Sequence, residues 1–255
     1  MPTTNQPRIT LKCLTVNFNS LKNKKEVFEE ILGRESPDIV FGCETWLSPN
    51  VLSTEILPPE YVCDQFRNDR PDGYGGVMIA LKNNLIGTRL DIINHCEISA
   101  AKVNTISGPP IIVCAVYRPP REDLNAAHQI CDALLDLYRR HPDSCFWISG
   151  DFNLPDIDWT SDSIEGHQFS LALNTLFLDT FQNIGLTQTV DFPTRINNTL
   201  DLFLTNRPTF ISECNAIPGV SDHEIVVTLS DTSVKQTKPV KRKVISYGKK
   251  RIYPN

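Results

Sequence analysis

The sequence predicts an α/β fold, a four-layer sandwich in which two packed mixed β-sheets are flanked by helices. Short apolar, β-rich runs recur along residues 9–229, and segments with helical periodicity lie between them. Some runs are apolar throughout, which is typical of strands buried on both faces, whereas others alternate between apolar and polar side chains. A chain of 255 residues can bury a large core without disulfides or structural metals.

The chain opens with a predicted strand, a helix and a second strand. Residues 9–17 alternate and are rich in β-formers, which predicts a strand. Ser20 is placed to cap a helix over residues 21–34, which ends before Pro37. Residues 38–43 are almost entirely apolar, and this favours a strand buried on both faces.

Four strand-like runs fill the middle of the chain and lead into a helix. The runs are residues 76–82, 86–94, 100–106 and 111–117. Turn residues separate several of them, notably Gly108-Pro109-Pro110. Between residues 121 and 141 the apolar side chains recur every three or four positions, which predicts an amphipathic helix.

The last third of the chain completes the core. Residues 145–150 form a buried strand that leads to Asp151, and residues 169–185 follow as a helix. The segments 201–205 and 224–229 are the last predicted core strands. Beyond Ser230 the periodicity stops. We therefore expect one domain over residues 9–230, an N-terminal extension over 1–8, and a poorly ordered basic tail or linker over 231–255.

Charge divides the chain at the same point. The net charge is −5, but eight of the 25 basic residues lie in residues 232–255, which contain no acid. Residues 1–231 therefore hold 17 bases against 30 acids, a net charge of −13. An acidic body suits a site for divalent cations. A basic tail suits a polyanionic partner, or it is a solvated linker.

The cysteines and the apolar runs limit the class of protein. Eight cysteines occur without a C-x-x-C pair, and most lie inside apolar runs, so we expect buried free thiols in a reducing compartment. The first seven residues carry no secretory signal, and no apolar run is long enough to span a bilayer. The sequence thus indicates no membrane partner. It carries no signal for the oligomeric state.

Polar residues gather at the predicted strand ends. The residues Asn17, Glu44, Tyr117 and Asp151 each follow an apolar run, and Asp222-His223 precede one. Catalytic groups commonly occupy loop positions held by a rigid sheet. A single acid after a strand is usually a turn or cap residue, but six polar residues at comparable positions point to a functional edge.

Two short motifs carry a family resemblance. Gly150-Asp151-Phe152-Asn153, together with Ser221-Asp222-His223, resembles the endonuclease/exonuclease/phosphatase superfamily. Further stretches resemble the endonuclease domain of LINE-type (non-LTR) retrotransposons related to CR1 and jockey elements. They are Asn17-Phe18-Asn19-Ser20-Leu21, Glu44-Thr45-Trp46-Leu47, Gly73-Tyr74-Gly75-Gly76-Val77, Tyr117-Arg118-Pro119-Pro120, Thr194-Arg195 and Leu200-Asp201-Leu202. The resemblance covers roughly residues 9–229 and implies a DNase I-like fold.

The resemblance implies a Mg²⁺-dependent site, which Mn²⁺ would also suit. Glu44 would ligate the metal, because hard cations prefer carboxylate oxygens. Asn17 would assist near the metal or the scissile phosphate. Asp222 would complete the metal or acidic cluster, and Ser221 would support it.

The same resemblance implies the catalytic groups. Asp151 would be the general base or would orient the attacking water, and a nearby cation would keep it ionised. Asn153 would donate hydrogen bonds to the attacked phosphate or to the water. Tyr117 would hydrogen-bond within the phosphate site. His223, as imidazolium, would contact a non-bridging phosphate oxygen, and Asp201 would hold its other ring nitrogen.

Three further residues would lie on the substrate side of the site. Thr194 matches a threonine that helps to shape the phosphate site in related proteins. Arg118 and Arg195 would either contact DNA phosphates or pair with the acidic body.

The function implied is an endonuclease that nicks target DNA and leaves a 3′-hydroxyl to prime reverse transcription. No Tyr-x-Asp-Asp-like polymerase motif is present, so the reverse transcriptase would lie outside this chain. A nuclear site of action follows from that role, and the basic clusters at 241–243 and 249–251 are compatible with it. The alternatives are a lipid or inositol phosphodiesterase or phosphatase of the same fold, and a non-catalytic nucleic-acid-binding remnant.

Overall fold

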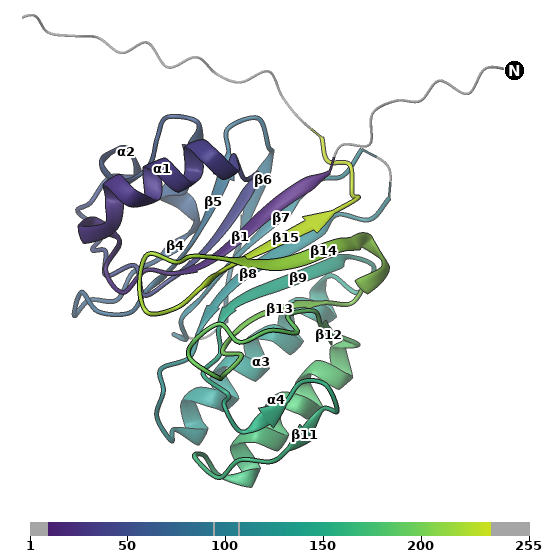
Figure 1. The fold of residues 1–255 in the computed structure, drawn as a ribbon. Helices are drawn as coiled ribbons and strands as arrows, with labels where there is room; N and C mark the ends of the chain where they lie inside the picture. Colours follow the sequence, from purple (N-terminus) through teal and green to yellow (C-terminus); the bar gives the residue numbers. More distant parts are fainter. Residues whose placement is uncertain (1–9, 94, 107, 236–255) are drawn as a thin grey trace, which may run out of the picture.

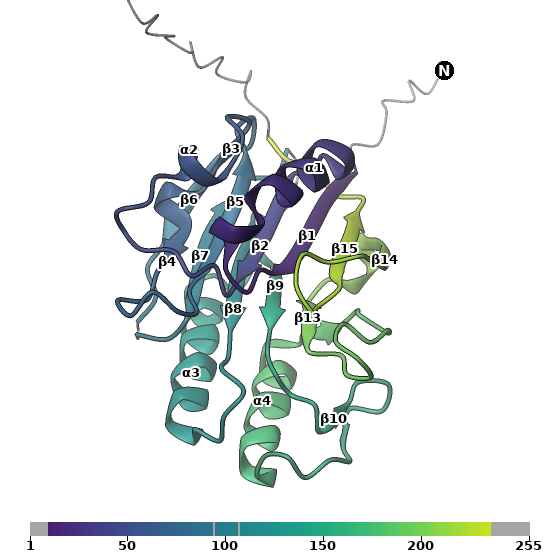
Figure 2. The ribbon, with the colours of Figure 1, turned by 60° about the vertical axis from the view of Figure 1, so that its left-hand side comes forward.

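A computed structural model describes residues 10–93, 95–106 and 108–235. Two β-sheets pack face to face, and helices cover the outer side of each sheet (Figures 1 and 2). Helix α1 (Lys25–Glu35) packs on one sheet, and helices α3 (Leu124–Arg140) and α4 (Leu171–Ile184) pack side by side on the other. The predicted four-layer α/β sandwich is confirmed.

The first sheet is mixed. In spatial order its strands are β14 (Ile211–Ile217), β15 (Ile225–Ser230), β1 (Leu11–Asn17), β2 (Ile39–Cys43), β5 (Val77–Lys82) and β3 (Tyr61–Val62), and β4 (Arg67–Asn68) also pairs with β5. Strands β1 and β2 are parallel, with Asn17 opposite Cys43, and the other pairs are antiparallel. Asn17 and the residue after Cys43, Glu44, therefore lie at the same edge of the sheet.

The second sheet is mixed in the same way. Its strands, in spatial order, are β12 (Thr187–Gln188), β13 (Asp201–Thr205), β9 (Cys145–Asp151), β8 (Ile111–Tyr117), β7 (Ile98–Val103) and β6 (Gly87–Leu90). The parallel pair β8–β9 places Tyr117 opposite Asp151, and antiparallel β13 places Asp201 opposite Asp151. Three polar residues of this sheet thus meet at one edge. A separate short hairpin joins β10 (Ile157–Asp158) to β11 (Ser163–Ile164).

The helices begin and end where local chemistry favours it, with one exception. Asp123 caps α3 by accepting a hydrogen bond from the Ala126 N–H, and Ser170 caps α4 in the same way. Gly185, with φ +73°, ends α4. The expected cap at Ser20 is wrong. Ser20 has φ +83° and makes no capping bond, and the first turn is a 3-10 helix.

The remaining helical segments are single turns. They are η1 (Leu21–Lys24), α2 (Ser53–Ile56), η2 (Asp64–Phe66) and η3 (Pro208–Phe210).

Large side chains fill the space between the two sheets. Phe41, Trp147 and Phe203 are fully buried there, and the rings of Phe41 and Trp147 each lie 6.0 Å from that of Phe203. Burying one such side chain stabilises a fold by about 1.5–3 kcal/mol. The sheets therefore form one rigid support for the residues at their common edge.

Polar contacts also cross between the sheets. The Thr15 and Ser149 hydroxyl oxygens lie 2.5 Å apart, and within the second sheet Ser149 donates to the Leu202 carbonyl at 2.6 Å. Nearer the edge, the Cys43 thiol donates to the Val116 carbonyl at 3.1 Å, and the Asp151 N–H lies 3.4 Å from its sulfur. Buried polar groups with partners fix the register of the two sheets.

The folded part continues past residue 230. Val234 is fully buried and bridges Thr105, while Ser233 accepts a hydrogen bond from the Ile106 N–H. The predicted extension over residues 1–8 and the tail from 236 to 255 lie outside the described residues. The expected free thiols are confirmed, since all eight cysteines are unpaired in the described chain and seven are buried. Within the described ranges, no helix has the length and apolar character needed to cross a bilayer.

Candidate active site

Six predicted polar residues meet where strands of both sheets end. Asn17 and Glu44 come from β1 and the residue after β2, and Tyr117 and Asp151 end β8 and β9. Asp201 begins β13, and His223 lies just before β15. In Figure 2 the arrowheads of β8 and β9 point to this end of the sandwich.

Asn17 joins the two sheets at this edge. Its amide nitrogen donates to Glu44 at 3.1 Å and to Asp151 at 2.9 Å, and its oxygen accepts from the Asn19 N–H at 3.2 Å. Both amide groups are therefore in use, and the two carboxylates are held on either side of one buried side chain. Asn17 is placed to orient acids.

Tyr117 is a neutral side chain beside the same acids, and it hydrogen-bonds to Glu44. Burial raises the pKa of its phenol, and the charges of Glu44 and Asp151, together with a hydrogen bond to Glu44, raise it further. The hydroxyl therefore stays protonated at neutral pH and can donate to an anionic oxygen.

Asp151 is surrounded by charge. Its side chain is 1% exposed, and its oxygens accept from the Asn17 amide and, at 3.1 Å, from the Asn153 N–H. Burial raises the pKa of Asp151 well above its ordinary value, and the nearby Asp201 and Glu44 carboxylates add to the rise. The positive charge that His223 can carry and the hydrogen bond from Asn17 act in the opposite direction.

His223 and Asp201 form a buried pair. The imidazole Nδ1 lies 2.7 Å from an Asp201 carboxylate oxygen, and both side chains are almost fully buried. Burial alone would lower the pKa of His223, but the hydrogen bond and the charge of Asp201, with that of Asp151, raise it overall. The pair therefore favours an imidazolium whose other nitrogen, Nε2, is free of this bond.

The acidic cluster fits a divalent cation. The ligand atoms of Asp151, Asp201 and His223 lie within 4.8 Å of one another. The second Asp201 oxygen, Oδ1, is buried and has no hydrogen-bond partner in the described part of the chain. An unpartnered carboxylate oxygen among like charges is the environment that a hard cation relieves, and carboxylate and amide oxygens are the donors that Mg²⁺ or Mn²⁺ prefers. Glu44, half-buried and joined through Asn17 to Asp151, adds a further carboxylate.

Asp222 lies apart from this cluster. Arg195 donates to one Asp222 oxygen from Nε at 2.9 Å and from Nη2 at 2.6 Å, and the carboxylate is largely exposed. Partial burial raises the pKa of Asp222, but Arg195 outweighs it and lowers the pKa overall. The sequence allowed Arg195 either to contact DNA phosphates or to pair with an acid of the body, and the structure contains the ion pair. Asp222 therefore does not join Glu44, Asp151 and Asp201 as a fourth acid, and it is absent from the cluster of Asp151, Asp201 and His223.

Ser221 and Thr194 support the site from behind. Ser221 donates to the Asn17 carbonyl at 2.7 Å and accepts from the His223 N–H at 3.3 Å, so it ties His223 to the end of β1. The Thr194 hydroxyl accepts from the Leu200 and Asp201 N–H groups, both at 3.0 Å. Thr194 therefore fixes where β13 begins and, with it, the position of Asp201.

Arg118 is occupied by backbone carbonyls. It is 2% exposed, and its guanidinium donates to the Asn153 carbonyl at 2.8 Å and to the Arg121 carbonyl at 3.0 Å. The guanidinium carbon also lies 4.3 Å from the centre of the Phe169 ring. In return the Asn153 amide donates to the Arg118 carbonyl at 2.8 Å. Arg118 thus holds Asn153, which has φ +48°, next to Asp151.

One residue of the site was not anticipated from the sequence. Cys43 was expected only as a buried hydrophobe, yet its sulfur contacts the Asp151 backbone and the Val116 carbonyl. Gly150, with φ +144°, makes this approach possible, because a Cβ there would collide with the Val116 carbonyl. The only signal in the sequence is the position of Cys43, at the last residue of a buried run and directly before Glu44.

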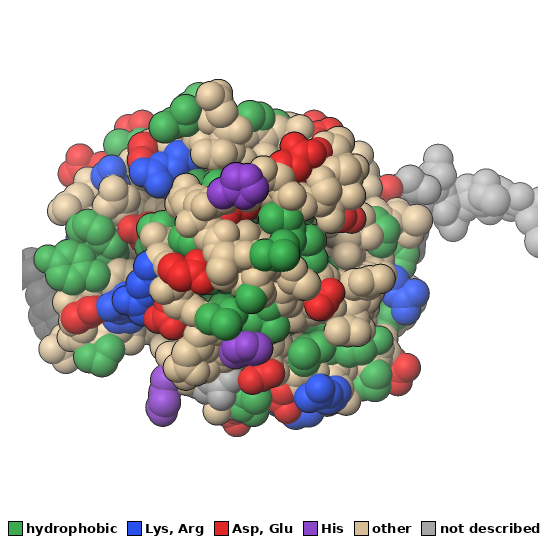
Figure 3. All heavy atoms as spheres, turned by 90° about the horizontal axis from the view of Figure 1, so that it is seen from below, with side chains coloured by type: hydrophobic (Ala, Val, Ile, Leu, Met, Phe, Trp, Pro, Cys, Tyr) green, Lys and Arg blue, Asp and Glu red, His purple; other side chains and the backbone are tan. Residues whose placement is uncertain are grey.

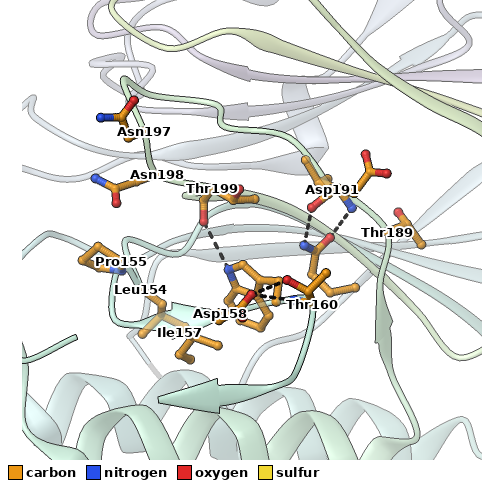
Figure 4. Close-up of a pocket in the computed structure, with 13 residues that line it drawn as sticks. Leu154, Pro155, Ile157, Asp158, Thr160, Thr189, Asp191, Asn197, Asn198 and Thr199 are labelled. Atoms are coloured by element: carbon orange, nitrogen blue, oxygen red, sulfur yellow. Dashed lines mark hydrogen bonds between the residues drawn. The ribbon is translucent and has the colours of Figure 1, made fainter. Parts of the chain in front are cut away.

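Two hollows lie beside the site. A pocket of about 310 Å³ is lined by residues 154–155 and 157–160 and by segments 188–191 and 197–199 (Figure 4). A smaller one of about 140 Å³ shares Pro155 and Asn198 with it and reaches Asn153 and Arg195. The molecule is seen from below in Figure 3, the side toward which β8 and β9 run, and Lys and Arg side chains are scattered among acids on that face. The described body offers little bulk attraction for a polyanion.

Comparison with known proteins gives one family match and several solved structures that share one fold. The family described as endonuclease-reverse transcriptase matches residues 111–227. The AP endonuclease LMAP from Leishmania major has a TM-score of 0.71 at 14% identity, covering 88% of this chain and 89% of that one. The endonuclease domain of TRAS1, a telomere-specific non-LTR retrotransposon, has a TM-score of 0.65 at 14% identity, covering 87% and 98%.

A third solved structure has the same fold. The catalytic domain of Xenopus laevis APE2 has a TM-score of 0.66 at 16% identity, covering 88% of this chain and 93% of that one. No curated protein matches the chain by sequence. At these identities the solved structures show that the fold is shared, and they agree with the expected DNase I-like architecture.

Proposed function

We propose that the chain is an endonuclease of the endonuclease/exonuclease/phosphatase superfamily, which nicks DNA by hydrolysing a phosphodiester bond; the match of residues 111–227 and the shared fold support this. The observation that carries the proposal is the buried cluster of Asp151, Asp201 and His223, whose ligand atoms lie within 4.8 Å of one another at the common edge of both sheets. In the cluster, Asp151 can act as a base, Asp201 orients the imidazole of His223, and that imidazole can carry a positive charge. In-line attack of water on phosphorus requires such a set of groups.

Each residue has a task that its contacts support. Asp151 takes a proton from the attacking water or orients that water, and Asn17 and Asn153 hold its two oxygens in place. His223, held by Asp201 at 2.7 Å, donates from Nε2 to a non-bridging phosphate oxygen. Tyr117 donates to the same phosphate.

The Asn153 side-chain amide already donates to the Arg118 carbonyl, and its remaining N–H can donate to the phosphate.

A divalent cation, Mg²⁺ in the first place, would be held by Glu44, Asp151 and Asp201, with Asn17 beside it. When bound, it supplies charge stabilisation for the phosphate and the leaving oxygen. Asp222 would act through its pair with Arg195, at the rim of the site, rather than as a ligand.

The family match also supports a role for the cut itself. A nick with a 3′-hydroxyl would prime reverse transcription by a polymerase outside residues 1–255, and the place of action would be the nucleus. This part of the proposal rests on the likeness of residues 111–227 to endonuclease-reverse transcriptases.

The test is nicking of supercoiled plasmid by the purified chain, with Mg²⁺ and with a chelator. We expect conversion to open circles with 3′-hydroxyl ends, and only with the cation. A phospholipid and an inositol phosphate are offered in parallel. Hydrolysis of either compound, without nicking of DNA, would indicate a lipid or inositol phosphodiesterase or phosphatase. DNA binding without hydrolysis of any substrate would indicate a non-catalytic remnant.

A further inference from the structure

Trp46, two residues beyond Glu44, forms an aromatic pair with Tyr74. The rings of Trp46 and Tyr74 meet edge to face, with centroids 5.2 Å apart and planes at 71°. The Tyr74 side chain is 61% exposed and Trp46 is half-buried. Large aromatic side chains are normally buried, so an exposed and mutually oriented pair beside a catalytic site indicates a contact surface. We call Trp46 and Tyr74 the aromatic pair.

The backbone under the aromatic pair is held in an unusual shape. Trp46 has φ +52°, a left-handed conformation that a bulky residue rarely adopts. Its N–H donates to the Gly75 carbonyl at 2.9 Å, and the Thr45 N–H donates to the Gly76 carbonyl at 3.3 Å. The Tyr74 N–H donates to Asp72 at 3.1 Å. Such strain is kept where the surrounding structure fixes it, and it is concentrated at functional sites.

The pair is also connected to the candidate active site. The Glu97 carboxylate accepts from the Gly76 N–H at 2.6 Å, and its carbonyl accepts from the Tyr117 N–H at 3.0 Å. Trp46 follows Glu44 by two residues on the other side. The aromatic pair therefore cannot shift freely relative to the residues that would hold the scissile phosphate.

The local charge favours a base over a phosphate as the occupant. The Arg70 guanidinium, which lies next to Gly75, is paired with Asp72 and, at 3.3 Å, with Glu97. An aromatic surface between satisfied ion pairs offers π faces and no free positive charge, which suits a nucleobase and not a phosphate.

Resting on the proposed function, we infer that the aromatic pair stacks on a nucleobase next to the scissile phosphate. A base inside a regular duplex is stacked on both faces, so it must unstack from one neighbouring base before it can stack on the aromatic pair. The free-energy cost of this unstacking is least at mismatches and at flexible pyrimidine–purine steps. The substrate preferred by this chain is therefore DNA in which the base beside the cut is unstacked.

Kinetics on two oligonucleotide duplexes, one fully paired and one with a mismatch beside the cut, test the inference. Trp46→Ala and Tyr74→Ala should each raise KM about 5- to 100-fold, the loss expected for one stacked base, while kcat changes far less. The preference for the mismatched duplex should shrink in both variants. Trp46→Phe and Tyr74→Phe, which keep an aromatic ring, should restore most of the affinity.

Phe210→Ala is the matched control, since Phe210 is 38% exposed and lies beyond the far end of β13. Unchanged KM and unchanged mismatch preference in both alanine variants, with a wild type that nicks, would overturn the inference and leave the proposed function standing.

A second measurement does not depend on cleavage. In a Trp159→Phe protein the remaining tryptophans are Trp46 and Trp147, which is 0% exposed, so quenching by an added single-stranded oligonucleotide reports on Trp46. Quenching supports stacking even if the wild type does not nick DNA. In that case the proposed function is wrong and the stacking inference stands. Absence of quenching at concentrations that saturate binding counts against stacking.

Discussion

Asn17, Asp151 and His223 acquire their properties from the residues around them. Asn17 uses both amide groups on neighbours, Asp151 is buried beside two other acids, and His223 is held by Asp201 at 2.7 Å. The sequence identified these residues through short motifs. It could not reveal that Arg195 pairs with Asp222, or that Arg118 turns inward to carbonyls, because both contacts depend on where loops distant in the sequence meet.

A second test at the scale of single residues asks whether Cys43 positions the Asp151 backbone. We expect Cys43→Ala to lower kcat about 10-fold, because the sulfur that supports the Asp151 backbone and the Val116 carbonyl is lost. Cys114→Ala is the matched control. Cys114 is equally buried, in the core beneath α3 and α4, and contacts no residue of the site.

Both variants should lose about 1 kcal/mol of stability, since each removes one buried sulfur atom. Equal kcat in the two variants, with equal denaturation midpoints, would show that Cys43 only fills space.

Strands β1, β2, β8, β9 and β13 were predicted within two residues of their observed ends, because buried strands are continuous apolar runs. These strands carry most of the site, so its layout followed from them. Strand β14 was missed, since an edge strand without one fully buried side chain has no apolar run to recognise. The two-residue strands β3, β4, β10, β11 and β12 were missed for a different reason: their pairing is set by tertiary contacts, not by local preference.

The segment between β9 and α4 depends on one carboxylate. Asp156 accepts from the Gln168 and Phe169 N–H groups at 2.8 and 2.7 Å and from the Asn174 amide at 3.1 Å. Burial alone would raise its pKa, but these three donors outweigh burial and lower the pKa below 3.8. Asp156→Asn should therefore reduce the free energy of unfolding by about 1.5–3 kcal/mol near neutral pH.

The pH dependence follows from the sign of that shift. A carboxyl group with a lowered folded pKa contributes its stability above the unfolded value, near 3.8, and loses it as pH falls through the folded value. Urea unfolding across pH ~3 to ~7 should thus show the wild-type advantage over Asp156→Asn shrinking at the acid end. Asp158→Asn, in an exposed turn with Thr160 and Ser161, should unfold at nearly the wild-type urea concentration. A constant difference at all pH values would contradict this account.

Over the whole molecule, charge is divided between the body and the tail. Residues 1–231 carry a net charge of −13, while residues 236–255 contain seven Lys and Arg and no acid. Under the proposed function, attraction for DNA would come from a bound cation, from local contacts such as the aromatic pair, and from the tail. Residues 231–235 lie with the body, since Val234 is buried against it.

Deleting residues 236–255 tests the contribution of the tail. If all seven bases contact phosphates, the slope of log Kd against log salt concentration should fall by up to about 6, since each contact contributes about 0.9. Binding is measured with a chelator present to prevent cleavage, and the thermal unfolding midpoint should not change. An unchanged slope and affinity would make the tail a linker.

The central claim is that His223, held by Asp201, stabilises the charge that develops on phosphate during cleavage. Plasmid nicking in Mg²⁺ by wild type, His223→Ala and the exposed control His128→Ala measures it directly. The account predicts a loss of about 10²–10³-fold in rate for His223→Ala, with a folded variant by circular dichroism and wild-type rates for His128→Ala. Nicking by His223→Ala at the wild-type rate would contradict it.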